Sequence, residues 1–287
     1  MQLSVVVITY NEEANIARTL ASVQPLVSDG KGEIIVVDSG STDRTVEIAK
    51  SYCAKVFIEE WKGFAAQKNS AVGKATGDWI LSLDADEEVD GTLVEEISWL
   101  MRAIPIWQKE GMPVDDDDQS KELRDRGSQL GLDEPDLDGF FIPRRNEFLG
   151  RWIHHGGFWP DSKMRLFRKG AARFEDRAVH EDAHLIKGVS SGLNGALLHH
   201  SYPTLADYLD HMNHYSSLGA EMVVAKGPVR FSPFNIIVRP AATFVYNYVF
   251  RLGFLDGREG LLLHLYHAVY VSWKYSKAWE LSRKKPT

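Results

Sequence analysis

Short apolar runs alternate with segments of helical period along the first hundred residues. The apolar runs are Leu3 to Thr9, Ile34 to Asp38, Val56 to Ile58 and Trp79 to Leu83. They are apolar at consecutive positions, which predicts central strands covered on both faces. Between them, Asn15 to Val23 has one apolar helical face, Ser41 or Thr42 can cap a second helix, and Thr92 begins a third. The alternation predicts an α/β fold with a mostly parallel central sheet.

An acidic stretch, residues 109–138, interrupts this pattern. It contains eleven acidic and four basic side chains, with Asp115 to Asp118 in a row and glycines and prolines between them. Four consecutive aspartates suggest calcium, but they lack the alternating ligands and the glycine of an EF-hand loop. We expect a mobile, solvated surface insertion without chemistry. Short strands and turns return from Phe140, and Pro203-Thr204 opens a further helix.

The last segment, residues 226–287, is basic and aromatic. It has ten Lys or Arg against three Asp or Glu, and it holds twelve of the 31 aromatic residues. Such a mixture suits a lipid headgroup interface, and Arg239 and Arg251 favour lying in the membrane surface over spanning it. The alternative is an amphipathic helical pair that packs on the parent domain or on a second subunit. We therefore expect an α/β domain over 1–225 and a helical, membrane-surface-associating segment over 226–287.

Composition narrows the partners and the compartment. The 287 residues carry a formal net charge of −7, which gives no general attraction for nucleic acid. The single cysteine, Cys53, excludes an internal disulfide framework and a thiolate zinc site. Met1 leads directly into an apolar run without a preceding basic region, which is typical of a strand rather than a signal peptide. We expect a cytoplasmic protein, and one that does not cross a membrane, because no run of about eighteen apolar residues occurs.

Polar side chains gather where three of the expected strands end. These ends read Thr9-Tyr10-Asn11-Glu12-Glu13, Asp38-Ser39-Gly40-Ser41-Thr42-Asp43 and Asp84-Ala85-Asp86-Glu87-Glu88. In an open α/β sheet, ligands bind outside the carboxyl ends of the strands. Asp84 and Asp86 are two positions apart, so they can reach the same side of the sheet edge and serve a divalent cation such as Mg²⁺ or Mn²⁺. Such an ion takes substrate phosphates as further ligands, which favours a nucleotide diphosphate.

The common phosphate-binding loops are missing. The chain has no G-x-x-x-x-G-K-[ST] and no G-x-G-x-x-G after a strand, which argues against ATPases and dinucleotide dehydrogenases. A nucleotidyltransferase that makes sugar nucleotides is disfavoured as well, because its glycine-rich N-terminal loop is absent. A nucleotide site that lacks these loops but has acidic groups at three strand ends resembles a nucleotide-sugar site in which metal, rather than a glycine-rich backbone, holds the pyrophosphate.

The three motifs, in this order and at this separation, resemble those of a family 2 glycosyltransferase of the GT-A (nucleotide-diphospho-sugar transferase) fold. The resemblance is carried by Val7 to Glu13, Val36 to Asp43 and Leu83 to Glu87. It implies a metal-dependent UDP-sugar transferase in which Asp38 contacts uracil, Asp84 faces the ribose and Asp86 holds the metal. Lys68 falls where the family often has an arginine, so it keeps the charge without the bidentate geometry. The nucleotide-binding residues implied in this way are Thr9, Tyr10, Asn11, Glu12, Asp38, Ser41, Lys68, Asp84, Ala85 and Asp86.

The second half resembles the β-1,4-glucosyltransferase group that adds glucose to the lipopolysaccharide inner core. The matching stretches are Arg144 to Gly150, Gly156 to Pro160, Arg165 to Arg168, Val179 to Glu181 and Gly253 to Arg258. This resemblance implies inverting transfer of a sugar, best matched by glucose from UDP-glucose, at the inner face of the cytoplasmic membrane. The insertion at 109–138 departs from the compact form of that group. Another lipid-linked or cell-surface glycan is therefore an alternative acceptor, and a non-catalytic sugar-nucleotide-binding protein is the alternative function.

An inverting transferase needs a base that takes the proton of the acceptor hydroxyl. Glu181 lies where the family places this carboxylate, Asp182 is the alternative, and a surface pairing of Glu181 with Arg177 or Arg173 is the non-catalytic reading. His180 could complete a metal shell that Asp86 and Asp84 begin, or it could orient the carboxylate. The adjacent pair His199-His200 cannot easily chelate one ion, because neighbours on a strand point to opposite faces. Acceptor or sugar contacts are expected from Arg144, Arg145, Trp152, Trp159 and Arg165, with solvated charge and hydrophobic packing as their alternative roles.

Overall fold

The computed structural model describes residues 2–110, 117–129, 137–175 and 182–284. The chain divides into two compact units. The first unit comprises Met1–Arg144, Ser162–Asp176 and Glu181–His199, and the second comprises Arg145–Asp161, Arg177–His180 and His200–Thr287. Each unit has a hydrophobic core of its own.

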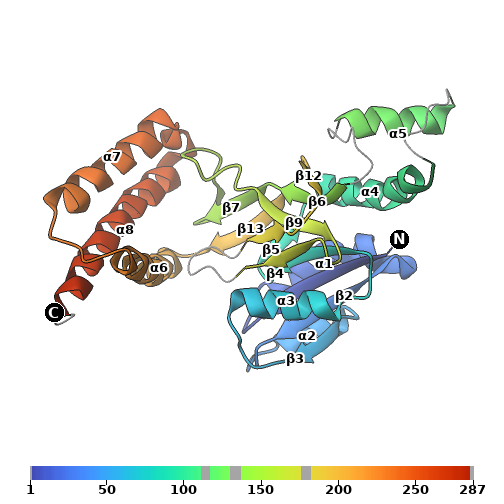
Figure 1. Ribbon diagram of the computed structural model, residues 1–287, viewed down its shortest axis with the longest axis horizontal. Coiled ribbons are helices and arrows are strands. Elements are labelled where there is room, and N and C mark those ends of the chain that lie inside the picture. The colour runs from blue at the N-terminus through green and yellow to red at the C-terminus, as the bar shows by residue number, and fades with distance from the viewer. Residues whose placement is uncertain (1, 111–116, 130–136, 176–181, 285–287) are drawn as a thin grey trace. The chain divides into compact units, whose positions relative to one another are not determined.

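A seven-stranded sheet forms the centre of the first unit (Figure 1). Its strands are β1 (Leu3–Thr9), β2 (Gly32–Asp38), β3 (Lys55–Ile58), β4 (Trp79–Asp84), β6 (Leu137–Ile142), β9 (Lys163–Arg168) and β12 (Val189–Gly192). The strand order is β12-β6-β9-β4-β1-β2-β3. Strands β1 to β4 are parallel, β12 is parallel to β6, and β9 is antiparallel to both of its neighbours. The predicted α/β class with a mostly parallel sheet is confirmed.

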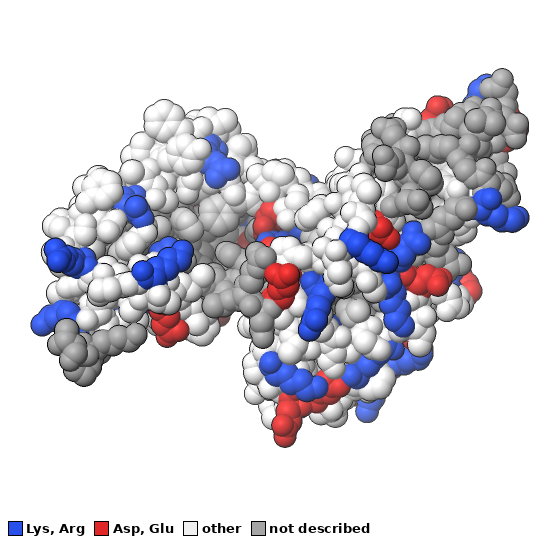
Figure 2. Space-filling view, viewed as in Figure 1, with Lys and Arg blue, Asp and Glu red and all other residues white. Residues whose placement is uncertain are grey.

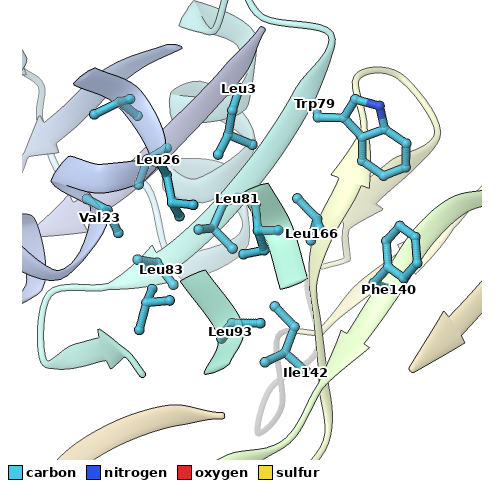
Figure 3. Close-up of a cluster of buried hydrophobic side chains, with 14 of the residues drawn as sticks. Leu3, Val23, Leu26, Trp79, Leu81, Leu83, Leu93, Phe140, Ile142 and Leu166 are labelled. Carbon is cyan, nitrogen blue, oxygen red and sulfur yellow. The ribbon is translucent and has the colours of Figure 1, made fainter. Parts of the chain in front are cut away.

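Helices cover both faces of this sheet. They are α1 (Ile16–Val27), α2 (Thr45–Ser51), α3 (Phe64–Lys74) and α4 (Gly91–Glu110), with a 3-10 turn η1 (Ser28–Gly30). A further helix, α5 (Asp118–Gln129), follows α4 in the chain. Alternate residues of a strand point to opposite faces. Val5 and Val7 therefore pack in one cluster with residues of α1 and α4, part of which Figure 3 shows, whereas Val6 packs in another with residues of α3. A strand buried on both sides needs the continuous apolar run seen in the sequence.

The structure departs from the sequence pattern at three places. The prediction that Val56 to Ile58 is a central strand is wrong, because β3 pairs only with β2 and Ile58 is exposed. Helix α3 has no predicted counterpart, because its buried positions include the small Ala65 and Ala71 and the polar Gln67. Within the acidic insertion, α5 is a helix rather than a loop.

Short strand pairs complete the first unit. Strand β5 (Glu87–Val89) pairs antiparallel with the beginning of β13 (Leu197–Tyr202). Strands β10 (Ala172–Phe174) and β11 (Ala183–Leu185) form a separate antiparallel pair. The pairing of β5 with β13 matters for the site, because it places residues near 199 beside residues near 87.

The second unit is mostly helical. It contains most of β7 (Arg144–Phe148), which pairs with β8 (Arg151–Trp152), and helices α6 (Leu205–Ala225), α7 (Arg239–Val245) and α8 (Gly257–Lys284). Short turns of helix, η2 (Phe234–Val238), η3 (Tyr246–Phe250) and η4 (Gly253–Asp256), flank α7 and precede α8. Thr204 caps α6 in a capping box with Asp207, and α6 and α7 both pack on α8. The predicted C-terminal helical appendage is confirmed.

Across the described part of the chain, no helix is both long enough and apolar enough to cross a membrane.

Candidate active site

The loops after β1 and β2 are joined by hydrogen bonds. The backbone N–H of Asn11 donates to Ser41 Oγ at 2.8 Å, and the N–H of Thr42 donates to Asn11 Oδ1 at 2.8 Å. The N–H of Glu12 donates to Thr45 Oγ1, also at 2.8 Å. Asn11 has a φ of 53°, a left-handed conformation that its side-chain hydrogen bond helps to hold. The parallel register, which aligns Thr9 with Asp38, therefore brings the first two motifs to one sheet edge.

Asp38 is fully buried at this edge. Its Oδ1 accepts hydrogen bonds from the N–H groups of Gly40 and Ser41 at 3.0 and 2.8 Å, and its Oδ2 accepts one from the Ser41 hydroxyl. Thr9 Oγ1 and Ser39 Oγ beside it are buried and have no hydrogen-bond partner among the described residues. Buried hydroxyls are normally paired, so these two mark a place where a ligand can supply the missing groups.

Asp84, at the end of β4, is held by two cations. Lys68 Nζ lies 2.7 Å from its Oδ1, and Arg165 Nη2 lies 2.5 Å from its Oδ2. Burial raises the pKa of Asp84, but the positive charges of Arg165 and Lys68 outweigh burial and hold that pKa well below its usual value. Lys68 itself is buried and comes from α3. Asp84 is therefore an ionised, fixed carboxylate.

Arg165 also neutralises Glu87. Its Nη2 lies 2.7 Å from Glu87 Oε1, which Arg144 Nη1 approaches to 3.4 Å, and Glu87 Oε2 accepts the N–H of Asp84 at 2.9 Å. The pairing of β6 with β9 shifts register here, so that Leu166 and Met164 face consecutive residues and Arg165 has no partner in β6. Such a bulge redirects a side chain, and it aims Arg165 at the carboxylates. The structure places Arg144 and Arg165 as counter-ions of buried acids.

Asp86 is partly exposed, to the same degree as Asp84, but its partner is a histidine. His199 Nε2, brought by the pairing of β13 with β5, lies 3.1 Å from Asp86 Oδ2. Burial raises the pKa of Asp86, but His199 outweighs burial and lowers it. Between the two aspartates, the carbonyl of Ala85 accepts a hydrogen bond from Thr19 Oγ1 at 2.6 Å, which ties this turn to α1.

Glu12 adds a third negative group. Burial raises the pKa of Glu12, a hydrogen bond from Asn15 lowers it, and the charges of Asp86, Asp43 and Asp84 raise it further. The net shift of the Glu12 pKa is upward, mainly because of burial, and the nearby carboxylates add to it. An accumulation of acids at the ends of three parallel strands is an environment that a cation relieves.

The residues present fit a divalent cation that shares its shell with a substrate. Within the described ranges, no three His, Cys, Asp or Glu side chains come together as a complete metal site. Mg²⁺ and Mn²⁺ at phosphate-binding sites need only one or two carboxylates, with phosphates and water completing the shell, and imidazole is an acceptable Mn²⁺ ligand. Asp86 and His199 offer such a set, whereas Lys68 and Arg165 already pair with Asp84.

The other expected site residues lie elsewhere. Glu181 and His180 fall outside the described residues. Asp182 lies 3.2 Å from Lys163 Nζ and lines a cavity of about 240 Å³ with residues of β9, β11 and β12. Tyr10 is exposed at the end of β1. Arg145, Trp152 and Trp159 belong to the second unit. The Arg145 guanidinium lies 5.0 Å from the Trp159 ring centre, and the ring centres of Trp152 and His200 lie 5.1 Å apart.

Sequence reasoning missed Glu87 and His199 as members of the site. The fourth strand end already contained Glu87, but nothing in the sequence distinguished its buried side chain from the exposed acids beside it. The argument that His199 and His200 cannot share an ion agrees with the structure, in which His199 contacts Asp86 and His200 Nδ1 lies 2.5 Å from Glu147 Oε2. His199 reaches Asp86 because β13 pairs with β5, which lies more than a hundred residues earlier in the chain.

Comparisons with known proteins agree with this geometry. A family model described as glycosyl transferase family 2 matches residues 4–173. An uncharacterized glycosyltransferase of Rickettsia typhi is 30% identical over 99% of this chain and 88% of its own length. The lipopolysaccharide core biosynthesis glycosyltransferase LpsC of Rhizobium meliloti is 27% identical over 94% of this chain and 89% of its own length.

Among solved structures, the fold is shared with the mannosyltransferase PcManGT of Pyrobaculum calidifontis, determined with GDP-Man and Mn²⁺. The TM-score is 0.54 at 15% identity, and the match covers 99% of this chain and 88% of that one. The prediction of a GT-A fold is confirmed.

Proposed function

This chain belongs to glycosyl transferase family 2, and we propose that it is an inverting, metal-dependent transferase that moves a sugar from a UDP-sugar to a hydroxyl of a membrane-displayed glycan such as the lipopolysaccharide inner core. Glucose is the proposed sugar. The support for the donor class is the site at the ends of β1, β2 and β4, and the support for the acceptor is the similarity to LpsC over most of the chain.

One observation carries the proposal, namely that Asp84 and Asp86 have different partners. Asp84 is fixed by Lys68 and Arg165, whereas the Asp86 carboxylate contacts only the His199 ring among the ion pairs of the described residues. A fixed carboxylate suits a hydroxyl ligand such as ribose, because it accepts hydrogen bonds without moving. The Asp86–His199 pair would hold a divalent cation, which would supply positive charge to the leaving diphosphate.

The nucleoside would lie against the loops after β1 and β2. The unpaired hydroxyls of Thr9 and Ser39 and the carboxylate of Asp38 line the base of these loops, and the exposed Tyr10 ring can stack on a planar base. Asn11 and Ser41 hold the two loops together, so that the donor meets a preformed surface. Ala85 supplies the turn that separates the two aspartates.

The transfer itself is a single displacement. The acceptor oxygen forms a bond to the anomeric carbon while the bond from that carbon to the diphosphate oxygen breaks, and the hydroxyl proton passes to a carboxylate. We assign this base to Glu181, with Asp182 as the alternative, on the family resemblance of the surrounding motif. Acceptor or sugar contacts are assigned to Arg145, Trp152 and Trp159, whereas Arg144 and Arg165 act on the buried acids of the donor site.

The test is UDP release from a panel of UDP-sugars in the presence of Mg²⁺ or Mn²⁺, with water as the slow acceptor. The variants are Asp86→Ala and Glu181→Ala, and the matched control is Asp29→Ala, which changes an acidic side chain at the surface of the same unit. We expect metal-dependent turnover of one sugar that is lost in both site variants and kept in the control.

Different outcomes separate the alternatives. Metal-dependent UDP binding without turnover would support a non-catalytic sugar-nucleotide-binding protein. Turnover that survives Asp86→Ala, or that needs no divalent cation, would remove the assigned metal site. Turnover of a sugar other than glucose would correct the donor and leave the site intact.

A further inference from the structure

The helical stretch from Phe234 to Phe250 presents an apolar face to solvent. It consists of η2, α7 and η3, which follow one another without a break. Its exposed side chains recur three and four positions apart, as expected for one face of a helix. We call this face the apolar stripe, and its members are Phe234, Ile237, Val238, Ala241, Ala242, Val245, Tyr246, Val249 and Phe250.

The opposite face of the same stretch is covered by α8. Pro240 is buried, and the carbonyl of Ile236 accepts a hydrogen bond from Ser272 Oγ at 2.8 Å. The Tyr248 ring centre lies 6.1 Å from that of His264. Asn235 and Asn247 lie on this less exposed side together with apolar residues, while the apolar stripe faces outward. A helix that packs on its own domain usually presents a polar face to solvent, and this stretch does not.

The exposed apolar surface continues beyond the stripe. Leu252, Phe254 and Leu255 follow in η4 and just before it, and Leu261 and Leu265 lie near the start of α8. Of the 22 large hydrophobic side chains that are exposed in the described residues, thirteen fall between Phe231 and Leu265. Single exposed hydrophobic residues are ordinary, but a concentrated apolar surface marks a place where another phase or molecule binds.

The exposed charges around this surface have one sign. Arg230, Arg239, Arg251 and Arg258 are exposed. Of the acidic residues between positions 227 and 265, Asp256 is buried and Glu259 is half-buried, 3.8 Å from Arg151. Arg239 stacks on the Tyr275 ring of α8, with its guanidinium 4.9 Å from the ring centre. On the face of the molecule in Figure 2, the C-terminal helices show blue groups separated by white surface and little red.

We propose that the apolar stripe lies in the surface of a lipid bilayer rich in anionic headgroups, with the arginines at the phosphates and α8 on the side away from the lipid. An amphipathic helix that lies in an interface needs an apolar face toward the acyl chains and cations at headgroup depth, and this stretch has both. The inference assigns to one face the membrane-surface association expected of residues 226–287. It rests on exposure and charge alone and does not require transferase activity.

The positive charge around the apolar stripe favours lipid over a second copy of the chain as its partner. In a two-fold interface the same surface meets itself, so the arginines around one stripe would face those around the other without acidic partners. Lipid phosphates supply the missing negative charge. A bilayer is therefore the partner whose chemistry complements both parts of the surface.

The experiment is flotation of the full-length chain with vesicles of pure phosphatidylcholine, or of phosphatidylcholine with about one third phosphatidylglycerol, at low and high salt. The test variant is Ile237→Asp/Phe250→Asp, whose side chains are 66% and 73% exposed, so that folding tolerates the change. The matched control is Ile58→Asp/Ile186→Asp in the first unit, where both side chains are 67% exposed.

We expect the wild-type chain and the control to float with anionic vesicles, and to do so less at high salt and with pure phosphatidylcholine. Burying one large apolar side chain changes a partition constant by roughly ten- to a hundredfold, so the stripe variant should lose on the order of a hundredfold or more. Equal flotation of stripe variant and wild type would overturn the proposal, as would the absence of wild-type flotation.

Sedimentation velocity distinguishes the second-copy alternative. A wild-type dimer that the stripe variant dissociates, without vesicle binding by either, would identify the stripe as an interface between copies and overturn the lipid assignment. UDP release measured on the same samples is a separate readout. If vesicle binding fails while turnover persists, this inference alone is lost, and the reverse result removes only the proposed function.

Discussion

Replacing Arg165 with methionine tests whether the buried charges of the proposed donor site are held by that one guanidinium. Methionine keeps most of the side-chain length and removes the charge. In the native structure Arg165 Nη2 lies 2.5 Å from Asp84 and 2.7 Å from Glu87, and the Glu87 side chain is fully buried. Removing one partner of a buried ion pair leaves an uncompensated charge, which costs about 3–5 kcal/mol.

The cations that stay near Asp84 and Glu87 in the variant determine where in that range the loss of unfolding free energy falls. Asp84 keeps Lys68 at 2.7 Å, and Glu87 keeps Arg144 at 3.4 Å and the N–H of Asp84 at 2.9 Å. We therefore expect Arg165→Met to lower the free energy of unfolding by about 3 kcal/mol at pH 7, the lower end of the range. The native pKa of Asp84 is lowered, so its stabilisation is complete above its unfolded pKa of about 4 and is lost as the pH falls below that value. The difference between variant and wild type should shrink accordingly below about pH 4.

Urea unfolding followed by tryptophan fluorescence at pH 7, 5 and about 3 measures this difference. The matched control is Arg44→Met, because Arg44 pairs with Glu47 at 3.1 Å but both side chains are exposed, and the unfolding midpoint should hardly move. If Arg165→Met unfolds at the same urea concentration as Arg44→Met, the buried network does not support the donor site and the reasoning is refuted. A difference that stays constant from pH 7 down to pH 4 and below would show that packing, not charge, is lost.

Three further results are expected. Partial burial raises the pKa of Glu33, but hydrogen bonds from Lys55, Thr76 and Ser4 outweigh burial and lower that pKa to about 2. Glu33 therefore stabilises the fold above about pH 4.5 and loses this effect as the pH falls toward 2. Glu33→Gln should flatten this part of the stability–pH curve, and an unchanged curve would contradict the assignment. His199→Ala should raise the Mn²⁺ concentration for half-maximal UDP release roughly ten- to a hundredfold, while His214→Ala, on the exposed side of α6, leaves it unchanged. Asp256→Ala should lower the free energy of unfolding by about 3 kcal/mol in thermal or urea unfolding, because its buried carboxylate accepts the N–H groups of two adjacent histidines and contacts one histidine ring; a loss below about 1 kcal/mol would mean that water replaces these bonds.

The central strands and the strand-end loops could be predicted from the sequence because their signals are local. The mostly apolar run Leu3 to Thr9 coincides with β1, since a strand covered on both faces is apolar at consecutive positions rather than at alternate ones. The polar groups after β1, β2 and β4 meet because parallel strands end at one edge of a sheet. The same logic failed at β3, where an apolar run forms an exposed edge strand. Whether a segment forms a strand depends mostly on its own residues, whereas the position of that strand in the sheet depends on distant segments.

The sequence by itself determined the kind of protein, an α/β chain with acidic strand ends in the pattern of family 2 glycosyltransferases, because each motif is a few consecutive residues. Only the tertiary structure decided what those residues contact. Arg165, expected at the acceptor, is turned onto Asp84 and Glu87 by a bulge, and His199 reaches Asp86 through a strand pair more than a hundred residues apart in the chain. The apolar stripe likewise depends on which side of its helix α8 covers. A residue type states which interactions are possible, whereas packing and register select the partner, and both depend on segments distant in the sequence.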